Sequence, residues 1–316
     1  MGYKSKITAL AVLSVILIAV FMTISANGNW EYILPRRGFR VLAIVITGAA
    51  IAFSTVIFQT ITNNRILTPS IIGLDSLYLL LQTFMIFAFG SIGFTLIHPY
   101  VNFLLSVTLM VVFAAILYKL LFKREGQNIY LLLLIGLVFG TLFSSLSTFM
   151  QVLIDPNEFM TVQDRMFASF NNVNTDLLGI SIILILLLSL YFYRFIKYLD
   201  VISLGREQAI NLGVDYDYVV KRLLFIVAIL VSIATALVGP ITFLGLLVAN
   251  VAHEFMKTYQ HKYLITAAIF ISIIALVGGQ LIVERVFTFS TTLSVIVNFI
   301  GGVYFLYLLL KESKKW

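Results

Sequence analysis

The sequence predicts an all-helical integral membrane protein, and three observations lead to this class. Of the 316 residues, 61% are hydrophobic and 11% are charged, whereas a soluble domain carries roughly 25% charged residues. The apolar residues form runs of roughly 20, the length that crosses a hydrocarbon core as a helix. These runs are continuous rather than alternating, which favours helices over a β-barrel.

Ten apolar runs are predicted to be membrane spans. They cover residues 7–27, 41–61, 71–93, 101–121, 129–153, 177–196, 222–239, 241–256, 264–283 and 292–310. The first run is long for a signal peptide and no small-residue cleavage site follows it, so we interpret it as an uncleaved first helix. Because the connecting stretches are short, we expect a single transmembrane domain over 1–316, with a cytoplasmic segment at about 200–221.

Charge sets the predicted orientation. If the N-terminus is cytoplasmic, sixteen of the 21 lysines and arginines fall on the cytoplasmic side, as basic residues do in membrane proteins. The other five, Arg36, Arg37, Arg40, Arg165 and Arg285, are then external. We therefore expect both termini in the cytoplasm. The chain has no cysteine, which excludes a thiolate metal site.

The cytoplasmic stretch Leu204–Val214 reads LGREQAINLGV and predicts a short amphipathic helix. Ala209 and Leu212 can face one side of it, and Gly213 is placed like a left-handed C-terminal cap. Such a helix either connects two spans or fits a groove in a partner protein. The residues alone leave both interpretations open.

This stretch resembles the coupling segment of the FecCD family, the permease subunits of ABC importers for ferric siderophores, haem and vitamin B12. Further matches follow in family order: Arg37-x-x-Arg40 with Thr47–Ala52; Gln59, Asn64, Pro69 and Gly73; Gly239–Val248; and Gly301–Leu309. The resemblance covers nearly the whole chain. Within the family, the chain is most similar to petrobactin-type ferric siderophore permeases of Gram-positive bacteria.

The chain also departs from the family pattern. Arg65 stands where proline is usual, Ala249 and Asn250 stand for Pro-His, and Thr292, Ser294 and Val303 replace Pro, Gly and Pro. The first of these departures lies beside the gate positions of the family, so they bear on gate geometry. Such divergence suits one half of a heterodimeric permease.

The resemblance implies a fold like the vitamin B12 importer permease and several partners. These are an ABC ATPase subunit, a second permease subunit (a heterodimer favoured, a homodimer possible), an extracytoplasmic binding protein, the ferric siderophore and membrane lipid, with no nucleic acid. The chain itself is expected to bind no cofactor, because it has no phosphate-loop motif. ATP would be used by the partner subunit, and the chain would not be an enzyme.

Site residues are also carried over by the resemblance. ATPase coupling falls on Leu204, Gly205, Glu207, Ala209, Leu212 and Gly213; binding-protein docking on Arg37, Arg40 and Arg285; and the cytoplasmic gate on Asn64 and Ile66. Each set has a plainer interpretation. The arginines can reach toward headgroups, with Glu284 as a local partner of Arg285, and the asparagine can belong to an ordinary turn.

Two other classes are weighed against an ABC permease. An ion-coupled secondary transporter would carry paired ionisable groups near the membrane midplane, where these spans have almost none. Asp75, near the start of the third span, is costly in lipid unless it lies at the water interface. In a hydrolase, His253-Glu254 would begin a zinc motif, but Lys257 replaces its second histidine and His261 is expected in a turn. ABC import of haem or cobalamin stays open.

Overall fold

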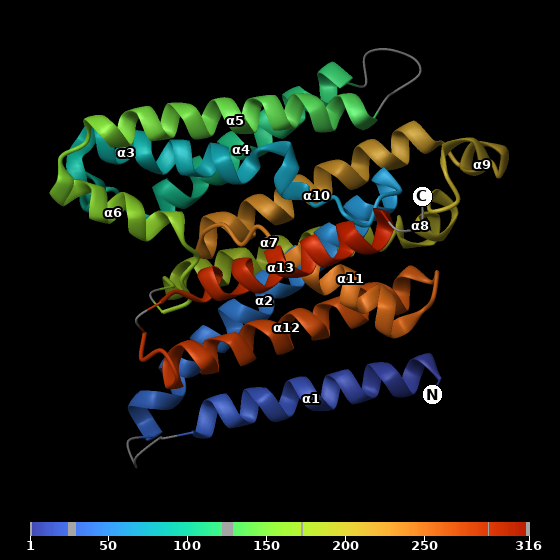
Figure 1. The fold of residues 1–316 in the computed structure, drawn as a ribbon, viewed down its shortest axis with the longest axis horizontal. Coiled ribbons are helices and arrows are strands. Elements are labelled where there is room, and N and C mark those ends of the chain that lie inside the picture. Colours follow the sequence, from blue (N-terminus) through green and yellow to red (C-terminus); the bar gives the residue numbers. More distant parts are fainter. Residues whose placement is uncertain (1, 25–29, 122–128, 172, 290, 314–316) are drawn as a thin grey trace.

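The computed structural model describes residues 2–24, 30–121, 129–171, 173–289 and 291–313, and these residues form a bundle of helices (Figure 1). Each predicted span coincides with one helix. They are α1 (Tyr3–Thr23), α2 (Trp30–Thr62), α3 (Leu74–Leu96), α4 (Pro99–Leu121), α5 (Ile129–Leu153), α7 (Thr175–Phe192), α10 (Tyr216–Val238), α11 (Leu244–Met256), α12 (His261–Arg285) and α13 (Leu293–Ser313). Within the described ranges, nine are long enough to cross a membrane, and α11 is a shorter apolar helix of 13 residues.

Four short elements connect these helices. They are the 3-10 turn η1 (Pro69–Ile72), α6 (Pro156–Met166), α8 (Ile196–Ile202) and α9 (Arg206–Asn211). The start of α1, α9 and the end of α13 lie at one end of the bundle, and α6 lies at the other (Figure 1). This agrees with the prediction that both termini and the 204–214 segment share a side. Which side that is stays a prediction from the charge distribution.

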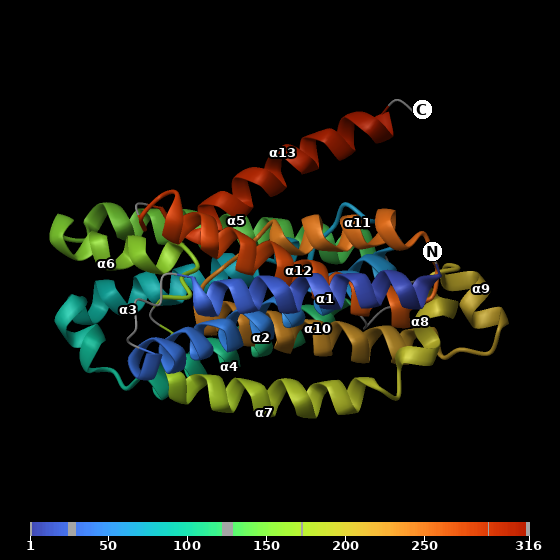
Figure 2. The ribbon, with the colours of Figure 1, turned by 90° about the horizontal axis from the view of Figure 1, so that it is seen from below.

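Helices α2 and α10 form the centre of the bundle. In each of them, 72% of the most apolar 18-residue stretch is buried within the structure, whereas in α1 the buried share is 17%. Helix α2 packs against α10, α11 and α12, and α1 covers α12 from outside. Small residues bring the axes close, because a Cβ on Gly245 would lie 2.1 Å from the Thr55 hydroxyl. Helix α13 leaves the bundle at an angle (Figure 2).

Helix α2 is longer than predicted. It begins at Trp30 rather than near residue 41, with Pro35 inside its second turn. Arg37 and Arg40 are therefore helical and three residues apart on one face, as the spacing required. Sequence pattern could not find this extension, because the segment before residue 41 is charged and lacks the apolar run that marks a span.

Two non-helical segments enter the bundle. Residues 63–73 include η1 and end at Gly73, whose φ of +88° is left-handed. A Cβ on Gly73 would lie 3.0 Å from the backbone of Gly140, near the middle of α5. Residues 239–243 break the path between α10 and α11, and Gly239 (φ +100°) lies equally close to the backbone of Ala168. Non-helical backbone inside a bilayer is tolerated only where protein or an internal cavity surrounds it. Both glycines are in close contact with the backbone of a neighbouring segment.

Candidate coupling, gate and docking sites

Local sequence determines how α9 ends. Gly213 adopts φ +82°, its N–H donates to Ile210 O at 2.9 Å, and the N–H of Val214 donates to Ala209 O at 3.0 Å. This pair of bonds is the Schellman motif, which requires a left-handed residue after the last helical turn. Val214 is buried and folds back toward Ala209, as the motif requires. The predicted cap at Gly213 is confirmed.

The exposed surface of α9 is apolar as well as charged. Leu204, Ile210 and Leu212 are 56%, 45% and 63% exposed, and Glu207 is exposed beside them. Ala209, in contrast, is fully buried within the chain. The prediction that Ala209 and Leu212 share one face is therefore wrong, because Ala209 packs inside the chain whereas Leu212 is exposed. Gly205, with φ +102°, begins the helix.

A polar bridge joins α8 to α12 and α2, with the His261 side chain buried and the Asp200 side chain 42% exposed. Asp200 in α8 accepts hydrogen bonds from the backbone N–H of His261 at 2.9 Å and from its ring Nδ1 at 2.6 Å. The Nε2 of the same ring lies 2.8 Å from the Thr60 hydroxyl in α2. His261 is 4% exposed and is the first residue of α12, not a turn residue as expected. It joins α8 to the first turn of α12 and to the central helix α2.

The gate segment is held by its own polar groups. The Asn64 side-chain oxygen accepts from the Ile66 N–H at 2.8 Å, which is the turn chemistry expected of this residue. The amides of Gln59 and Asn250 both donate to the carbonyl of Arg65, at 2.6 and 2.8 Å. Two departures from the family pattern, Arg65 and Asn250, are thus joined to each other.

A pocket of about 460 Å³ opens beside this segment. It is lined by Tyr3, Arg65, Ile66, Asn250, His253, Glu254, Lys257, Thr258, Tyr259, Tyr304 and Leu308. Both Arg65 and Asn250 therefore line the pocket, and so does the predicted gate residue Ile66. Asn64 is not among its lining residues.

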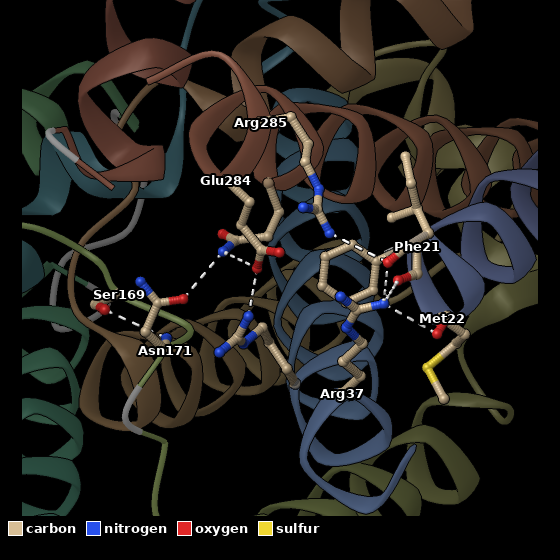
Figure 3. A network of polar contacts seen from close by, with 10 residues as sticks. Phe21, Met22, Arg37, Ser169, Asn171, Glu284 and Arg285 are labelled. Carbon is tan, nitrogen blue, oxygen red and sulfur yellow. Dashed lines mark hydrogen bonds and ion pairs between the residues drawn. The ribbon is translucent and has the colours of Figure 1, made fainter. Parts of the chain in front are cut away.

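At the α6 end of the bundle, two of the predicted docking arginines donate hydrogen bonds to the carbonyls at the C-terminal end of α1. Arg37 donates to the carbonyls of Phe21, Met22 and Ile24 at 3.0, 3.1 and 2.7 Å. Arg285 also donates to Ile24 O, at 3.2 Å (Figure 3). The last carbonyls of a helix lack partners within it, and cations there are also favoured by the helix dipole.

The third arginine, Arg40, is used differently. It forms an ion pair with Glu284, and the two side chains are only 11% and 6% exposed. The same carboxylate accepts from Gln280 at 3.1 Å, and Gln280 also donates to Asn171 at 3.0 Å (Figure 3). Glu284 is therefore the partner of Arg40 and not of its neighbour Arg285.

The arginines at this end of the bundle share a basic pocket of about 490 Å³. Its lining comprises Tyr32, Ile33, Arg36, Arg37, Arg40, Glu284, Arg285 and Phe289. Four arginines face one glutamate there, so the pocket suits an acidic group. Arg36, which the sequence argument left out, is exposed and contacts the Tyr32 hydroxyl at 3.1 Å.

Sequence reasoning missed the contacts that position these sites. Asp200 and His261 are 61 residues apart, and Arg40 and Glu284 are 244 apart. No local pattern joins them. The only signal available was that each is a polar residue near the end of an apolar run.

A bundle of membrane-length helices, with re-entrant segments, a capped helix at one end and a basic pocket at the other, defines a polytopic membrane transport protein. The profile of the FecCD transport family matches residues 5–311. The chain belongs to this family, which confirms the resemblance seen in its motifs.

Similar proteins agree with this membership. The chain is 65% identical to the petrobactin import system permease protein YclO of Bacillus subtilis, over all of both chains. It is 37% identical to the petrobactin import system permease protein FatC of Bacillus anthracis, over 89% of this chain and 79% of that one. A solved structure described as an inward-facing metal-chelate type ABC transporter shares the fold, with a TM-score of 0.86, 23% identity and coverage of 98% and 100%.

Proposed function

We propose that the chain is a permease subunit of an ATP-driven ABC importer that moves ferric petrobactin from an extracytoplasmic binding protein into the cytoplasm. The observation that carries this proposal is the 65% identity to YclO over the full length of both chains. FatC, named for the same substrate in a second species, supports it.

The proposed complex contains two permeases and two ATPases in a bacterial cell membrane, with both termini of this chain in the cytoplasm. Bacillus subtilis has a second petrobactin import permease, YclN, which is 26% identical to this chain over 87% of its length. A relative of that kind is the expected partner, which favours a heterodimer. The ATPase is a separate chain, because this sequence has no phosphate-loop motif.

Coupling to ATP hydrolysis is assigned to α9. Three exposed apolar side chains on a short helix outside the spans, Leu204, Ile210 and Leu212, are costly in water and suit a groove in the ATPase. Gly205 and Gly213 shape the helix, and buried Ala209 sets its position. The permease makes and breaks no bond; the ATPases bias its two access states.

The other two sites are assigned by position. Ile66 lines the cytoplasmic pocket and Asn64 fixes its backbone, which supports a gate at this segment. The basic external pocket supports docking of acidic side chains, since arginine binds carboxylates with two parallel hydrogen bonds. Because Arg37, Arg40 and Arg285 already have partners within the chain, Arg36 joins the proposed docking set.

Iron uptake tests the substrate. A strain lacking this gene is supplied with labelled iron as ferric petrobactin, with haem or with labelled cobalamin, before and after the gene is restored. We expect a loss of petrobactin-dependent uptake alone, reversed by the restored gene. Normal petrobactin uptake with a loss of haem or cobalamin uptake would reassign the substrate. Uptake that persists without the ATPase and stops when the ion gradient collapses would indicate a secondary transporter.

A further inference from the structure

The side chain of Arg65 lines the pocket at the α9 end of the bundle. In the sequence it stands between Asn64 and Ile66, the two proposed gate residues, and it is exposed. It shares the lining of the pocket of about 460 Å³ with Ile66. A solute that leaves through a gate at this segment therefore passes the guanidinium group of Arg65.

The backbone of Arg65 is held from two helices. Gln59 in α2 and Asn250 in α11 are only 3% and 7% exposed. Their side-chain amides donate to the carbonyl of Arg65 at 2.6 and 2.8 Å. The carbonyl is thus directed at these two helices, while the side chain lies on the pocket side. The positive charge is therefore presented from a fixed point rather than from a free loop.

The charge of Arg65 is not neutralised by the described part of the chain. Its guanidinium forms no ion pair there, whereas Arg40 is paired with Glu284, and both hydrogen bonds of Arg65 described above use its carbonyl. Lys257, the other cation of the lining, follows the last residue of α11, where a cation offsets the helix dipole. Arg65 lies outside any helix, so the dipole gives no such reason for its charge.

The rest of the lining is compatible with a negatively charged solute. Glu254 is the one carboxylate among the described lining residues, against the two cations Arg65 and Lys257. The phenol groups of Tyr3 and Tyr259 can donate hydrogen bonds to anionic oxygens. A ferric chelate built from catecholate or carboxylate oxygens carries a net negative charge, whereas a trihydroxamate chelate is neutral. The pocket therefore suits the first kind of chelate better than the second.

We propose that Arg65 makes the cytoplasmic gate selective for anions. Its fixed positive charge attracts a negatively charged ferric chelate to the exit and repels cations, as arginine and lysine side chains do in other pores. The proline that is usual in the family at this position carries no charge, so the selectivity is a property of this chain. The inference rests on the proposed import function and gate, and it adds the charge class of the substrate.

Cysteine modification measures the local charge directly, because the chain has no cysteine of its own. The complete importer is purified with Tyr259→Cys, at an exposed position of the lining. Two methanethiosulfonate reagents, one with a sulfonate and one with a trimethylammonium group, are then compared by the mass of this chain. The sulfonate rate divided by the ammonium rate should fall about threefold in Arg65→Gln and about tenfold in Arg65→Glu. The control Arg222→Glu, at an exposed arginine outside the pocket lining, should leave this ratio unchanged.

Transport in proteoliposomes separates this inference from the proposed function. With the complete importer, its binding protein and ATP, uptake of ferric petrobactin should stay near wild type in Arg65→Lys. It should be about threefold slower in Arg65→Gln and slower still in Arg65→Glu, because only the lysine keeps the charge. The Tm should be the same in all three variants, since the bonds to the carbonyl remain.

The two measurements fail in different ways. If the wild type takes up no ferric petrobactin, the proposed substrate is wrong, and the reagent ratios still decide whether Arg65 attracts anions. If the wild type takes it up and Arg65→Glu changes neither the uptake rate nor the reagent ratio, the inference is overturned and the proposed function stands. Equal losses of uptake in Arg65→Lys and Arg65→Glu would also overturn it, because shape rather than charge would then matter.

Discussion

The two ends of the bundle both carry charged and polar groups, but they use them in opposite ways. At the α6 end, Arg37, Arg40 and Arg285 are bound to carbonyls and to Glu284 of the same chain. At the α9 end, Leu204, Ile210 and Leu212 are left exposed, and the polar contact of Asp200 with His261 joins α8 to α12. A charged residue near a span end is therefore not by itself a docking residue. What its side chain already contacts decides what remains for a partner.

The largest effect should come from breaking the buried ion pair. Arg40→Ala leaves the Glu284 carboxylate buried without its partner, and we expect the free energy of unfolding to fall by about 3 to 5 kcal/mol. Denaturant unfolding in detergent measures this. Replacing both residues with methionine should recover most of the loss. The matched control Arg36→Ala, at an exposed arginine of the same helix, should change stability by less than about 0.5 kcal/mol. Equal effects of the two single changes would contradict the role assigned to the pair.

Charge on the exposed face of α9 should affect transport more than folding. In Ile210→Glu with Leu212→Glu, carboxylates replace the two apolar side chains proposed to contact the ATPase, so iron uptake should drop at least tenfold, a cost of about 1.4 kcal/mol. The Tm of the purified chain should stay unchanged. Ala209→Arg serves as the comparison. Because Ala209 is buried, this substitution should lower both the stability of the chain and iron uptake. Wild-type uptake by the double glutamate variant would reduce α9 to a simple connector.

The left-handed cap should contribute a smaller amount. Gly213→Ala places a Cβ at φ +82° and should destabilise the chain by about 1 to 2 kcal/mol. Thermal unfolding measures it. Gly179→Ala is the control, because Gly179 is inside α7 with no other atom within 4 Å of the added Cβ; it should be neutral or stabilising. A silent Gly213→Ala would show that local capping does not hold α9.

The smallest effect is expected at the external pocket. Arg36→Glu should weaken binding of the extracytoplasmic binding protein a few-fold, because exposed ion pairs contribute only about 0 to 1 kcal/mol. The difference from wild type should shrink as salt rises. Reversing Arg37 and Arg40 together would weaken docking but also disturb α1 and Glu284, so Arg36 gives the cleaner test. Unchanged binding at low salt would limit these arginines to structural roles.

Sequence pattern accounts for the features that depend on neighbours along the chain. The ten spans follow from apolar runs, and α9 follows from its amphipathic pattern and from Gly213, since a Schellman cap needs only residues within one turn. The ordered motifs identify the FecCD family. The extension of α2 to Trp30 was not predictable, because the segment has no apolar run and its contacts with the bundle are made by Arg37 with the end of α1 and by Arg40 with Glu284 of α12.

The sequence by itself determined that this chain is a helical membrane protein, which apolar runs form its helices and which short helix ends in a left-handed glycine. Only the tertiary structure decided that Glu284 pairs with Arg40, that His261 bridges Asp200 and Thr60, and that Ala209 faces inward. It alone brought Asp75 and Thr235, 160 residues apart, within hydrogen-bonding distance. The physical reason is the distance along the chain over which each interaction acts. Hydrophobic runs and caps act over one helical turn or one span, whereas these polar contacts exist only once distant helices have packed.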